Sequence, residues 1–250
     1  MRIAVCVKRV PDMELRFSIA PDRKSLDPAG LKYDLSDFDG YALEVALRLV
    51  EQRGQGEVVA ISLGPDDVQE TLRKALSMGA TRAVQLKADA VPADGMATAR
   101  ALAAELGEGG YDLILFGRMA TDTAHQTVGP MTAQLLGLPC VTAITHLDLA
   151  DGRGTARRAL EGAVETVTFP LPAVLTIDEG IARPRLPSLK GIMAAKKKTV
   201  EVKPARLGEA RLTIQSMELP PDRPPGRIIG EGPDAVPELV RLLQTEAKVL

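Results

Sequence analysis

Strand-like and helix-like segments alternate along the first half of the chain. Apolar, strand-like runs occupy residues 2–10, 57–64 and 111–117, and amphipathic segments at 36–54 and 66–80 lie between them. The amphipathic segments begin with Ser or Asp in capping positions and end at or beside a glycine, as α-helices commonly do. Strands that alternate with helices are typical of βαβ units. The sequence therefore predicts an α/β fold, a doubly wound and mostly parallel sheet.

This alternation changes after residue 140. Residues 154–160 and 163–169 are two strand-like runs separated by Glu161-Gly162, a pattern that predicts an antiparallel hairpin. Residues 172–177, "PAVLTI", form one more apolar run. We therefore expect antiparallel strands added to the doubly wound sheet, and we see no internal repeat in the sequence.

The C-terminal part of the chain has a different composition. Residues 217–233 are rich in proline and glycine and cannot continue a helix or a sheet, whereas the residues after them have the pattern of a short amphipathic helix. Such an arm has no core of its own and needs a surface to pack on. We expect an α/β domain at 1–205, which includes a basic loop at 183–198, and an arm at 206–250 that packs on a partner subunit.

Composition excludes several classes of protein. No apolar run approaches the roughly 20 residues that cross a bilayer, and the N-terminus lacks a signal-peptide pattern, so we expect a cytoplasmic protein without membrane insertion. The two cysteines, Cys6 and Cys140, lie in apolar runs and are expected to be buried and inert. With two histidines, His125 and His146, and no CxxC pair, neither a disulfide framework nor a metal site is expected.

Catalytic motifs do not occur in the chain. It contains no GxSxG, HExxH, Walker A or strand-turn GxGxxG sequence. We therefore expect no active site in which a side chain serves as acid, base or nucleophile.

The loop "GRMATDTAHQTVGPMTAQLLG" (117–137) is a candidate phosphate-binding segment. It follows an apolar strand and leads into a helix, and it carries several hydroxyl and small side chains. Free N–H groups at a helix N-terminus favour an anion, and ligands of open α/β sheets collect at the carboxyl ends of strands. Residues 62–65 and 36–39 lie at comparable positions. The alternative is an ordinary N-cap without a ligand, since Thr and Asp are common capping residues.

Positive charge is concentrated between Arg183 and Arg206. This window holds eight Lys or Arg and one Glu, a net charge of +7, so the rest of a chain of net charge −2 carries −9. Nucleic acid is not expected as the partner because the window has no aromatic residue for stacking. A membrane patch would need an adjacent amphipathic helix or lipid anchor. Two interpretations of Leu189 remain: an exposed anchor for a protein partner, or a side chain that packs on its own domain.

Several separated segments of the chain resemble the β subunit of electron transfer flavoprotein. These are "AVCVKRVPD", "GPDDVQETLRKALSMGATRAV" and "LPAVLTIDEGIARPRLPSLKGIMAAKKK", together with residues 156–176, which are similar to the signature region of that family. The matching signature positions are Arg158, Glu161, Gly162, Glu165, Val167, Pro172, Val174, Leu175 and Thr176. The resemblance covers nearly the whole chain.

This resemblance implies a fold and a nucleotide site. The fold is that of adenine-nucleotide α-hydrolases and universal stress proteins. A partner α subunit carries most of a redox FAD, and the β subunit binds AMP in a structural role and provides one wall near the flavin, where Phe38 is the approaching aromatic. The implied cofactor-binding positions are Cys6, Ser36, Asp37, Phe38, Asp39, Leu63, Gly117, Ala120, Thr121, Asp122, Thr123, His125, Gln126, Thr127 and Val128.

The resemblance also implies protein partners. Leu189 matches the anchor of a recognition loop that docks acyl-CoA and related dehydrogenases, whose electrons pass to a membrane quinone oxidoreductase in fatty acid oxidation. The arm would wrap the α subunit in a heterodimer. The positions assigned to partner docking are Leu189, Arg185, Lys190, Ile192, Met193, Lys196 and Lys197.

Some positions depart from the family pattern. Asp122 is the only acid of the loop, Ala124 replaces an expected acid, and Ala194 stands where a basic residue is frequent. The Gly129-Pro130 ending resembles members that hold a second FAD and bifurcate electrons from NADH, which is the alternative function. A stand-alone nucleotide-binding stress-type protein is a third hypothesis, which the proline-rich arm and the segment around Leu189 argue against.

Overall fold

Contacts within the chain divide it into two units. The computed structural model describes residues 1–223 and 225–250, and the units are Met1–Met217 and Glu218–Leu250. Pro224, which belongs to the predicted proline-rich segment, lies outside the described residues. The two units are described separately below.

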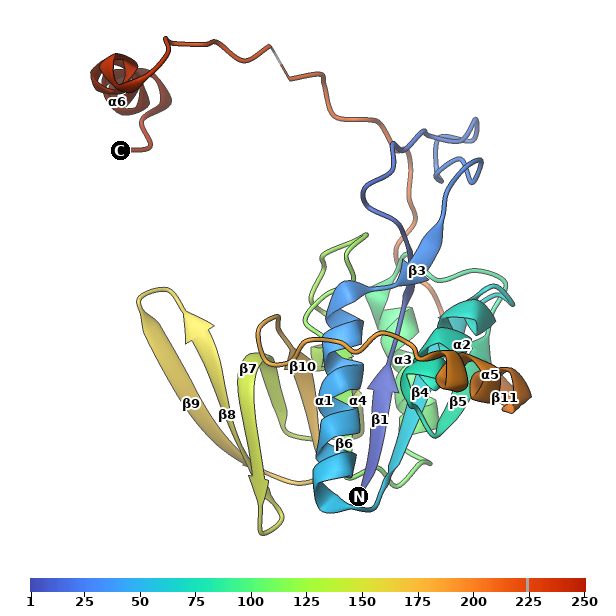
Figure 1. Ribbon diagram of the computed structural model, residues 1–250. Coiled ribbons are helices and arrows are strands. Elements are labelled where there is room, and N and C mark those ends of the chain that lie inside the picture. The colour runs from blue at the N-terminus through green and yellow to red at the C-terminus, as the bar shows by residue number, and fades with distance from the viewer. Residues whose placement is uncertain (224) are drawn as a thin grey trace. The chain divides into compact units, whose positions relative to one another are not determined.

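A nine-stranded sheet forms the centre of the first unit (Figure 1). Its strand order is β11-β5-β4-β1-β6-β10-β7-β8-β9, and the first seven of these run parallel. The parallel strands are β1 (Arg2–Cys6), β4 (Glu57–Gly64), β5 (Arg82–Lys87), β6 (Leu113–Gly117), β7 (Cys140–Ala150), β10 (Ala173–Ile177) and β11 (Val200–Pro204). The hairpin β8 (Arg153–Leu160) and β9 (Ala163–Pro170) extends the sheet in antiparallel fashion, as predicted.

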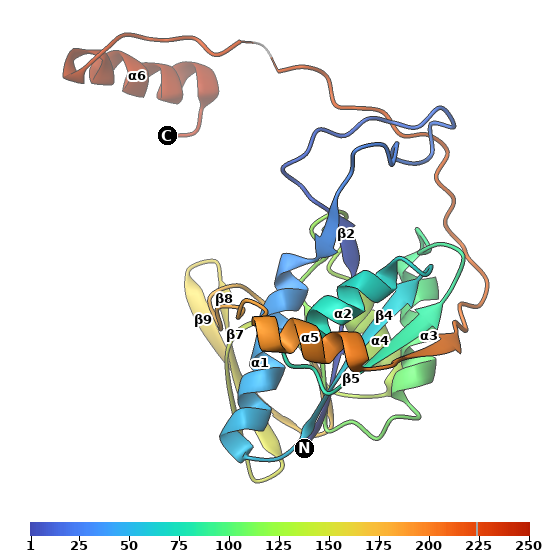
Figure 2. The same ribbon diagram turned by 45° about the vertical axis from the view of Figure 1, so that its right-hand side comes forward.

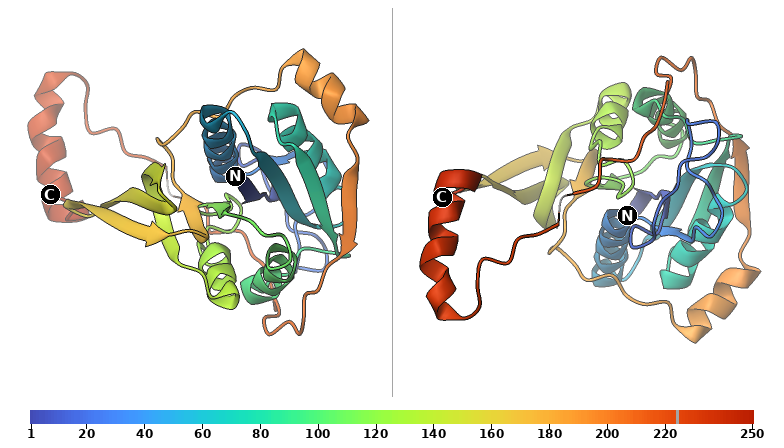
Figure 3. Two further views of the ribbon diagram at one scale, coloured as in Figure 1. Left: turned by 90° about the horizontal axis from the view of Figure 1, so that it is seen from below. Right: turned by 90° about the horizontal axis from the view of Figure 1, so that it is seen from above.

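Helices cover both faces of the sheet. Buried side chains of α1 (Asp37–Arg53) and α2 (Val68–Met78) pack into one core, and those of α3 (Gly95–Leu106) and α4 (Val128–Leu136) pack into a second core on the other face. Figure 3 shows these three layers with the sheet seen end-on. Strands buried on both faces need uninterrupted apolar runs, which explains the composition of "EVVAISLG" and "LILFG". The predicted doubly wound fold is confirmed.

The winding of the sheet reverses direction at β1. The chain passes from β1 to β4 and then to β5 on one side, and afterwards crosses to β6, which pairs with the other edge of β1. In doubly wound folds this reversal opens a crevice at the carboxyl ends of the strands. A ligand site is therefore expected beside the carboxyl end of β1.

The predicted strand at residues 2–10 is two strands. β1 ends at Cys6, and β2 (Arg9–Pro11) begins a separate antiparallel ribbon with β3 (Tyr33–Leu35). Between them the backbone N–H of Lys8 donates to the Asp39 carboxylate at 2.8 Å. This side-chain acceptor replaces the ladder partner that a continuous strand would need.

The prediction for the cysteines is half wrong. Cys6 is buried at the end of β1, and burial raises the pKa of its thiol well above the ordinary value, so the thiol stays protonated and unreactive. Cys140 is exposed because it is the first residue of β7, where the sheet emerges at the surface. Apolar neighbours in sequence indicated the strand but not the position of the residue within it.

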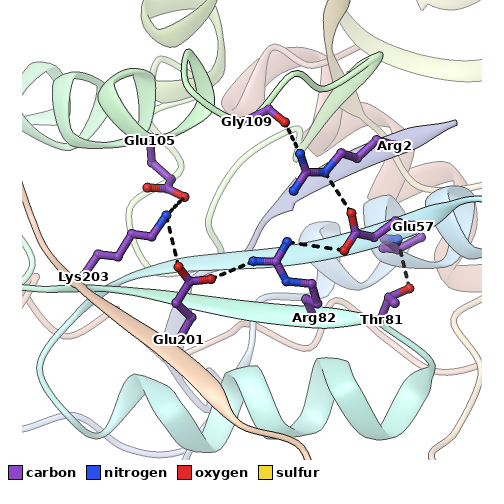
Figure 4. Close-up of polar contacts among 9 residues, drawn as sticks. Arg2, Glu57, Thr81, Arg82, Glu105, Gly109, Glu201 and Lys203 are labelled. Atoms are coloured by element: carbon purple, nitrogen blue, oxygen red, sulfur yellow. Dashed lines mark hydrogen bonds and ion pairs between the residues drawn. The ribbon is translucent and has the colours of Figure 1, made fainter.

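A network of ion pairs holds the edge strand β11 at the amino ends of the parallel strands (Figure 4). Arg82 contacts Glu201 at 2.7 Å and Glu57 at 3.4 Å, and Lys203 contacts Glu105 at 2.7 Å and Glu201 at 3.3 Å. The network continues from Glu57 to Arg2 at 2.8 Å. Exposed pairs contribute little individually, but the linked charges join β1, β4, β5, β11 and α3.

The second unit contains one short helical region. A 3-10 turn at Pro233–Ala235 leads into α6 (Val236–Leu242) and a π-helical turn at Leu243–Ala247. The residues described between 218 and 232 form neither helix nor strand, in agreement with the prediction. Several large apolar side chains of the helix and the terminus are exposed, namely Val236, Leu239, Val240, Val249 and Leu250. Across the described residues, no helix combines the length and the apolar character needed to span a membrane.

Candidate functional site

Four parallel strands end around one pocket. Residues of β4, the carboxyl ends of β1 and β6, and the segments that follow β1, β5 and β6 contribute to it, and the first turn of α4 completes the lining. The pocket is partly open to solvent, and apolar and polar side chains both line it. Its position matches the crevice expected at the reversal point of the sheet.

Most of the predicted cofactor-binding residues line this pocket. They are Cys6, Asp39, Leu63, Gly117, Ala120, Thr123, His125, Gln126, Thr127 and Val128. The pocket lining does not include Ser36, Asp37, Phe38, Thr121 and Asp122. Segments as far apart in sequence as Cys6 and Gly117 therefore meet at one site, because the parallel strands end together.

Three of the residues outside the lining hold the pocket loop in place through hydrogen bonds. The buried Ser36 hydroxyl accepts a hydrogen bond from the Thr121 N–H at 3.4 Å, which joins the start of α1 to the loop after β6. Asp122 accepts two hydrogen bonds from the ammonium of Lys8, at 2.7 and 2.8 Å. These contacts hold the loop against the ends of β1 and α1.

Asp39 lies buried at the base of the pocket. Its Oδ1 accepts from the Gly117 N–H at 3.0 Å and its Oδ2 accepts from the Lys8 N–H at 2.8 Å, so that one carboxylate links α1, β1 and β6. Burial raises the pKa of Asp39 to about 7, although the two N–H donors and the Lys8 charge oppose this shift. The site therefore holds a carboxylate that titrates near neutral pH.

We expect Asp39 to make stability fall as pH rises. The pKa of Asp39 is about 7 in the folded chain and near the ordinary 3.8 in the unfolded chain. The unfolded chain therefore loses this proton at a lower pH than the folded chain, and the free energy of unfolding decreases between about pH 4 and pH 7. The total decrease in the free energy of unfolding is at most about 4 kcal/mol, since each unit of pKa difference corresponds to about 1.36 kcal/mol. Urea unfolding at pH 5 and pH 8 measures it, with Asp39→Asn as the reference that cannot ionise. Equal pH dependence of the two proteins would contradict this assignment.

The loop between β6 and α4 has a strained backbone. Ala124 and Gln126 have φ values of 51° and 56°, a region that residues other than glycine seldom occupy. Arg118 contacts Asp178 at 2.9 Å and the Gln126 side chain at 3.3 Å, which fastens the loop to the end of β10. The Thr127 side chain makes no capping hydrogen bond to α4, so the first N–H groups of this helix are available to a ligand.

Sequence reasoning missed one wall of the pocket. This wall follows β5 and begins α3, and its lining residues are Val91, Pro92, Ala93, Gly95 and Thr98. Lys8 and Ile61 also line the pocket and were not among the predicted positions, whereas Arg118 and Met119 belong to the predicted loop at 117–137. β5 is parallel to β4 and ends at the same edge of the sheet, so the strand order places this wall in the pocket. Lys8 stood within the quoted "KRVPD" segment, but nothing in that pattern indicated its contact with Asp122.

The basic segment is partly helical. The Ser188 hydroxyl accepts from the Gly191 N–H at 3.0 Å and caps α5 (Leu189–Lys197), which packs against α2 (Figure 2). The expected loop at 183–198 therefore ends in nine helical residues, because Ser188 starts a helix where the proline and glycine content suggested continuous turns. The Leu189 side chain is 78% exposed, and Ile192 and Met193 are also exposed.

The cations of this segment differ in their environment. Within the part of the chain that the structure describes, Lys190, Lys196 and Lys197 make no ion pair. Arg185, by contrast, is paired with Glu44 and Glu51 of α1. Three of the four predicted docking cations are therefore free to face a partner.

The fold and the pocket define a doubly wound α/β protein with a ligand crevice at the carboxyl edge of its sheet. Residues 25–207 match the family described as "Electron transfer flavoprotein domain". The chain is similar to "Electron transfer flavoprotein subunit beta" of Homo sapiens (36% identical, 96% of each chain) and of Bacillus subtilis strain 168 (35% identical, 100% of each chain). It is also similar to "Electron transfer flavoprotein subunit beta, mitochondrial" of Oryza sativa subsp. japonica (37% identical, 100% of each chain).

The chain belongs to the electron transfer flavoprotein family, as a β subunit. The resemblance stated from the sequence is thereby confirmed. Its role is electron transfer as part of a flavoprotein.

Proposed function

We propose that this β subunit binds AMP in the pocket and, with its α subunit, holds one FAD that relays single electrons from acyl-CoA and related dehydrogenases to a membrane quinone oxidoreductase. The observation that carries the nucleotide part is the pocket itself, which brings together family-matched segments from three strand ends. Side chains of this chain position the groups, and the bound flavin supplies the redox chemistry.

The residues of the pocket fit an adenine nucleotide. Leu63, Val91 and Phe116 provide apolar surface for a flat base, and the uncapped N–H groups of α4 suit a phosphate. The cations Lys8 and Arg118 line the pocket but are already paired with Asp122 and Asp178. A phosphate there would be held mainly by backbone N–H groups.

Phe38 has an environment that suits a separate flavin contact. It is half-buried, makes an edge-to-face contact with Tyr41 at 5.9 Å between ring centroids, and does not line the nucleotide pocket. We propose that this ring faces the FAD that the α subunit carries, while the nucleotide occupies the pocket beside it.

The alternative function is electron bifurcation with a second FAD in the pocket. The Gly129-Pro130 ending of the loop favours it, because that ending resembles the bifurcating members. Ala124 argues for AMP, because it stands where an acid is expected in a loop with the Gly-Pro ending.

Flavin reduction distinguishes the two functions. The complex with its α subunit is mixed anaerobically with an acyl-CoA dehydrogenase and its acyl-CoA substrate, or with NADH alone, and the loss of oxidised-flavin absorbance is followed. We expect reduction by the dehydrogenase and none by NADH. Rapid reduction by NADH alone would support the bifurcating alternative.

Removing residues 218–250 should abolish stable association with the α subunit. We propose that the arm, residues 206–250, packs on that subunit, because its exposed Val236, Leu239 and Val240 have no core of their own within the second unit. Size-exclusion chromatography of the co-expressed chains measures the association. A one-to-one complex of the truncated chain, as stable as that of the full chain, would contradict the role of the arm.

A further inference from the structure

The docking segment, residues 183–198, is fixed to the body of the protein by a charged side chain that sequence reasoning assigned to the partner. We propose that Arg185 is a positioning residue: its guanidinium clamps the segment to α1, so that Leu189 stands at a fixed place for a docking dehydrogenase. This inference rests on the proposed docking function of Leu189 and changes the role of Arg185 within it.

Arg185 makes five hydrogen bonds to two carboxylates of α1. Its Nε and Nη2 donate to Glu44 at 2.8 and 3.2 Å, and its Nη1 and Nη2 donate to Glu51 at 2.5 and 3.0 Å. Its backbone N–H also donates to Glu44 at 3.2 Å. A guanidinium that spans two carboxylates in this way is held in one orientation, and a lysine cannot reproduce the geometry.

Burial of Glu44 makes the clamp strong. The Glu44 side chain is 4% exposed, and its charge partners are Arg185 and Arg48, with Arg48 Nε at 2.7 Å. Burial alone would raise the pKa of Glu44, but the hydrogen bonds from the two arginines outweigh it and lower that pKa. If Arg185 turned outward to a partner, a buried carboxylate would lose most of its compensation, which is costly. Arg185 is therefore retained by α1.

Neighbouring contacts fix the same end of the segment. The Arg48 guanidinium donates to the Arg183 carbonyl at 3.4 Å, and the Pro184 ring lies within van der Waals distance of a Cβ placed on Gly40. Immediately after the clamp, Leu186 is 90% exposed and Leu189 follows three residues later. The apolar side chains thus project from a backbone that is already held.

The other end of the segment is fixed to α2. The Arg73 guanidinium donates to the Ala195 carbonyl at 3.2 Å, and the Lys198 ammonium donates to the Ala80 carbonyl at 2.7 Å. Gly191 lies so close to α2 that an added Cβ would meet the Ser77 carbonyl oxygen at 2.3 Å. A segment ordered at both ends loses little conformational entropy when a partner binds, which improves affinity.

Removal of the Glu51 charge distinguishes two roles of Arg185, the positioning of the docking segment and the electrostatic attraction of an acidic partner. If Arg185 attracted an acidic partner, Glu51→Gln would add net positive charge at the surface and would favour docking. If Arg185 positions the segment, Glu51→Gln removes half of the clamp and weakens docking despite the added charge. Arg185→Lys keeps the positive charge but loses the planar guanidinium that binds both carboxylates. If Arg185 positions the segment, this variant should therefore also dock more weakly.

The experiment uses the complex with its α subunit. We expect Glu51→Gln and Arg185→Lys each to raise the KM of an acyl-CoA dehydrogenase for the flavoprotein about 5-fold with kcat within about 2-fold, because the segment must then be ordered on binding. Amide exchange of residues 183–192 should rise about 10-fold. The matched control is Glu70→Gln on α2, an exposed carboxylate whose side chain makes no hydrogen bond or ion pair among the described residues.

Two outcomes would overturn the inference. A KM for Glu51→Gln that equals or falls below that of Glu70→Gln excludes positioning, whatever the exchange shows. Leu189→Ala is measured in parallel, because it shows whether the segment docks a dehydrogenase at all, independently of the role of Arg185. If Leu189→Ala leaves KM unchanged, docking at this segment is wrong and the role of Arg185 in it falls as well. If Leu189→Ala raises KM and Glu51→Gln does not, only the role of Arg185 is wrong.

Discussion

Gly117→Ala should destabilise the protein by about 3 kcal/mol and abolish binding in the proposed nucleotide pocket, because an added methyl group has no space at this position. A Cβ on Gly117 would lie 2.5 Å from Asp39 Oδ1 and 2.6–2.7 Å from the backbone of Phe38 and Asp39. Relief would require α1 to move away from β6, which breaks the hydrogen bond from the Gly117 N–H to Asp39. Chemical unfolding and nucleotide content after purification measure the two effects.

Gly40→Ala provides the matched control for this prediction. Gly40 also lies near the start of α1, but a Cβ there would meet Pro184 at 3.6 Å, an ordinary contact. Alanine is about 1 kcal/mol more favourable than glycine within a helix, so this variant should be as stable as the parent or more stable. If Gly117→Ala behaved like Gly40→Ala, the close packing of α1 on β6 would not be what shapes the pocket.

Leu189→Ala should lower kcat/KM for electron transfer from an acyl-CoA dehydrogenase by roughly 10- to 100-fold, the effect of losing an apolar anchor. The side chain is 78% exposed and contributes little to the core, so stability and flavin content should not change. Stopped-flow reduction of the flavin by the dehydrogenase measures the rate, and flavin absorbance measures the content.

Leu135→Ala is the control for the anchor, because Leu135 is an exposed leucine, 46% accessible, on α4 and away from the docking segment in sequence. It should transfer electrons at the parent rate. An equal loss in both variants, or a loss of FAD in Leu189→Ala, would contradict a specific role of Leu189 in docking.

Local patterns predicted the fold well because each one has a direct physical cause. Apolar runs such as residues 57–64 became strands buried on both faces, and glycines such as Gly54 ended helices in the left-handed conformation. The break between β1 and β2 could not be predicted in this way. It depends on the Asp39 carboxylate, which takes the Lys8 N–H from 31 residues away in sequence.

The pocket was predictable only where a strand end carried a distinctive sequence. The loop after β6 stood out by its hydroxyl and small residues, and it does line the pocket. Residues 91–98 have no such signature, and their place in the pocket follows from the strand order alone. The raised pKa of Asp39 depends on burial, which the neighbouring residues "SDFDG" do not indicate.

Charge pairing was the least predictable property of the docking segment. The sequence shows Arg185 and the lysines as one basic cluster, but Arg185 is matched by Glu44 and Glu51 more than 130 residues earlier. Pairing over such distances is decided by which elements the fold places side by side. Net charge of a segment therefore overestimated the number of cations that can meet a partner.

We would first measure the nucleotide content of the heterodimer. The chain is co-expressed with its α subunit, the purified complex is denatured, and the released nucleotides are identified by chromatography and mass spectrometry. We expect one FAD and one AMP for each heterodimer. Two FADs without AMP would contradict the proposed AMP site and support the bifurcating alternative, and a complex without flavin would contradict the proposed function as a whole.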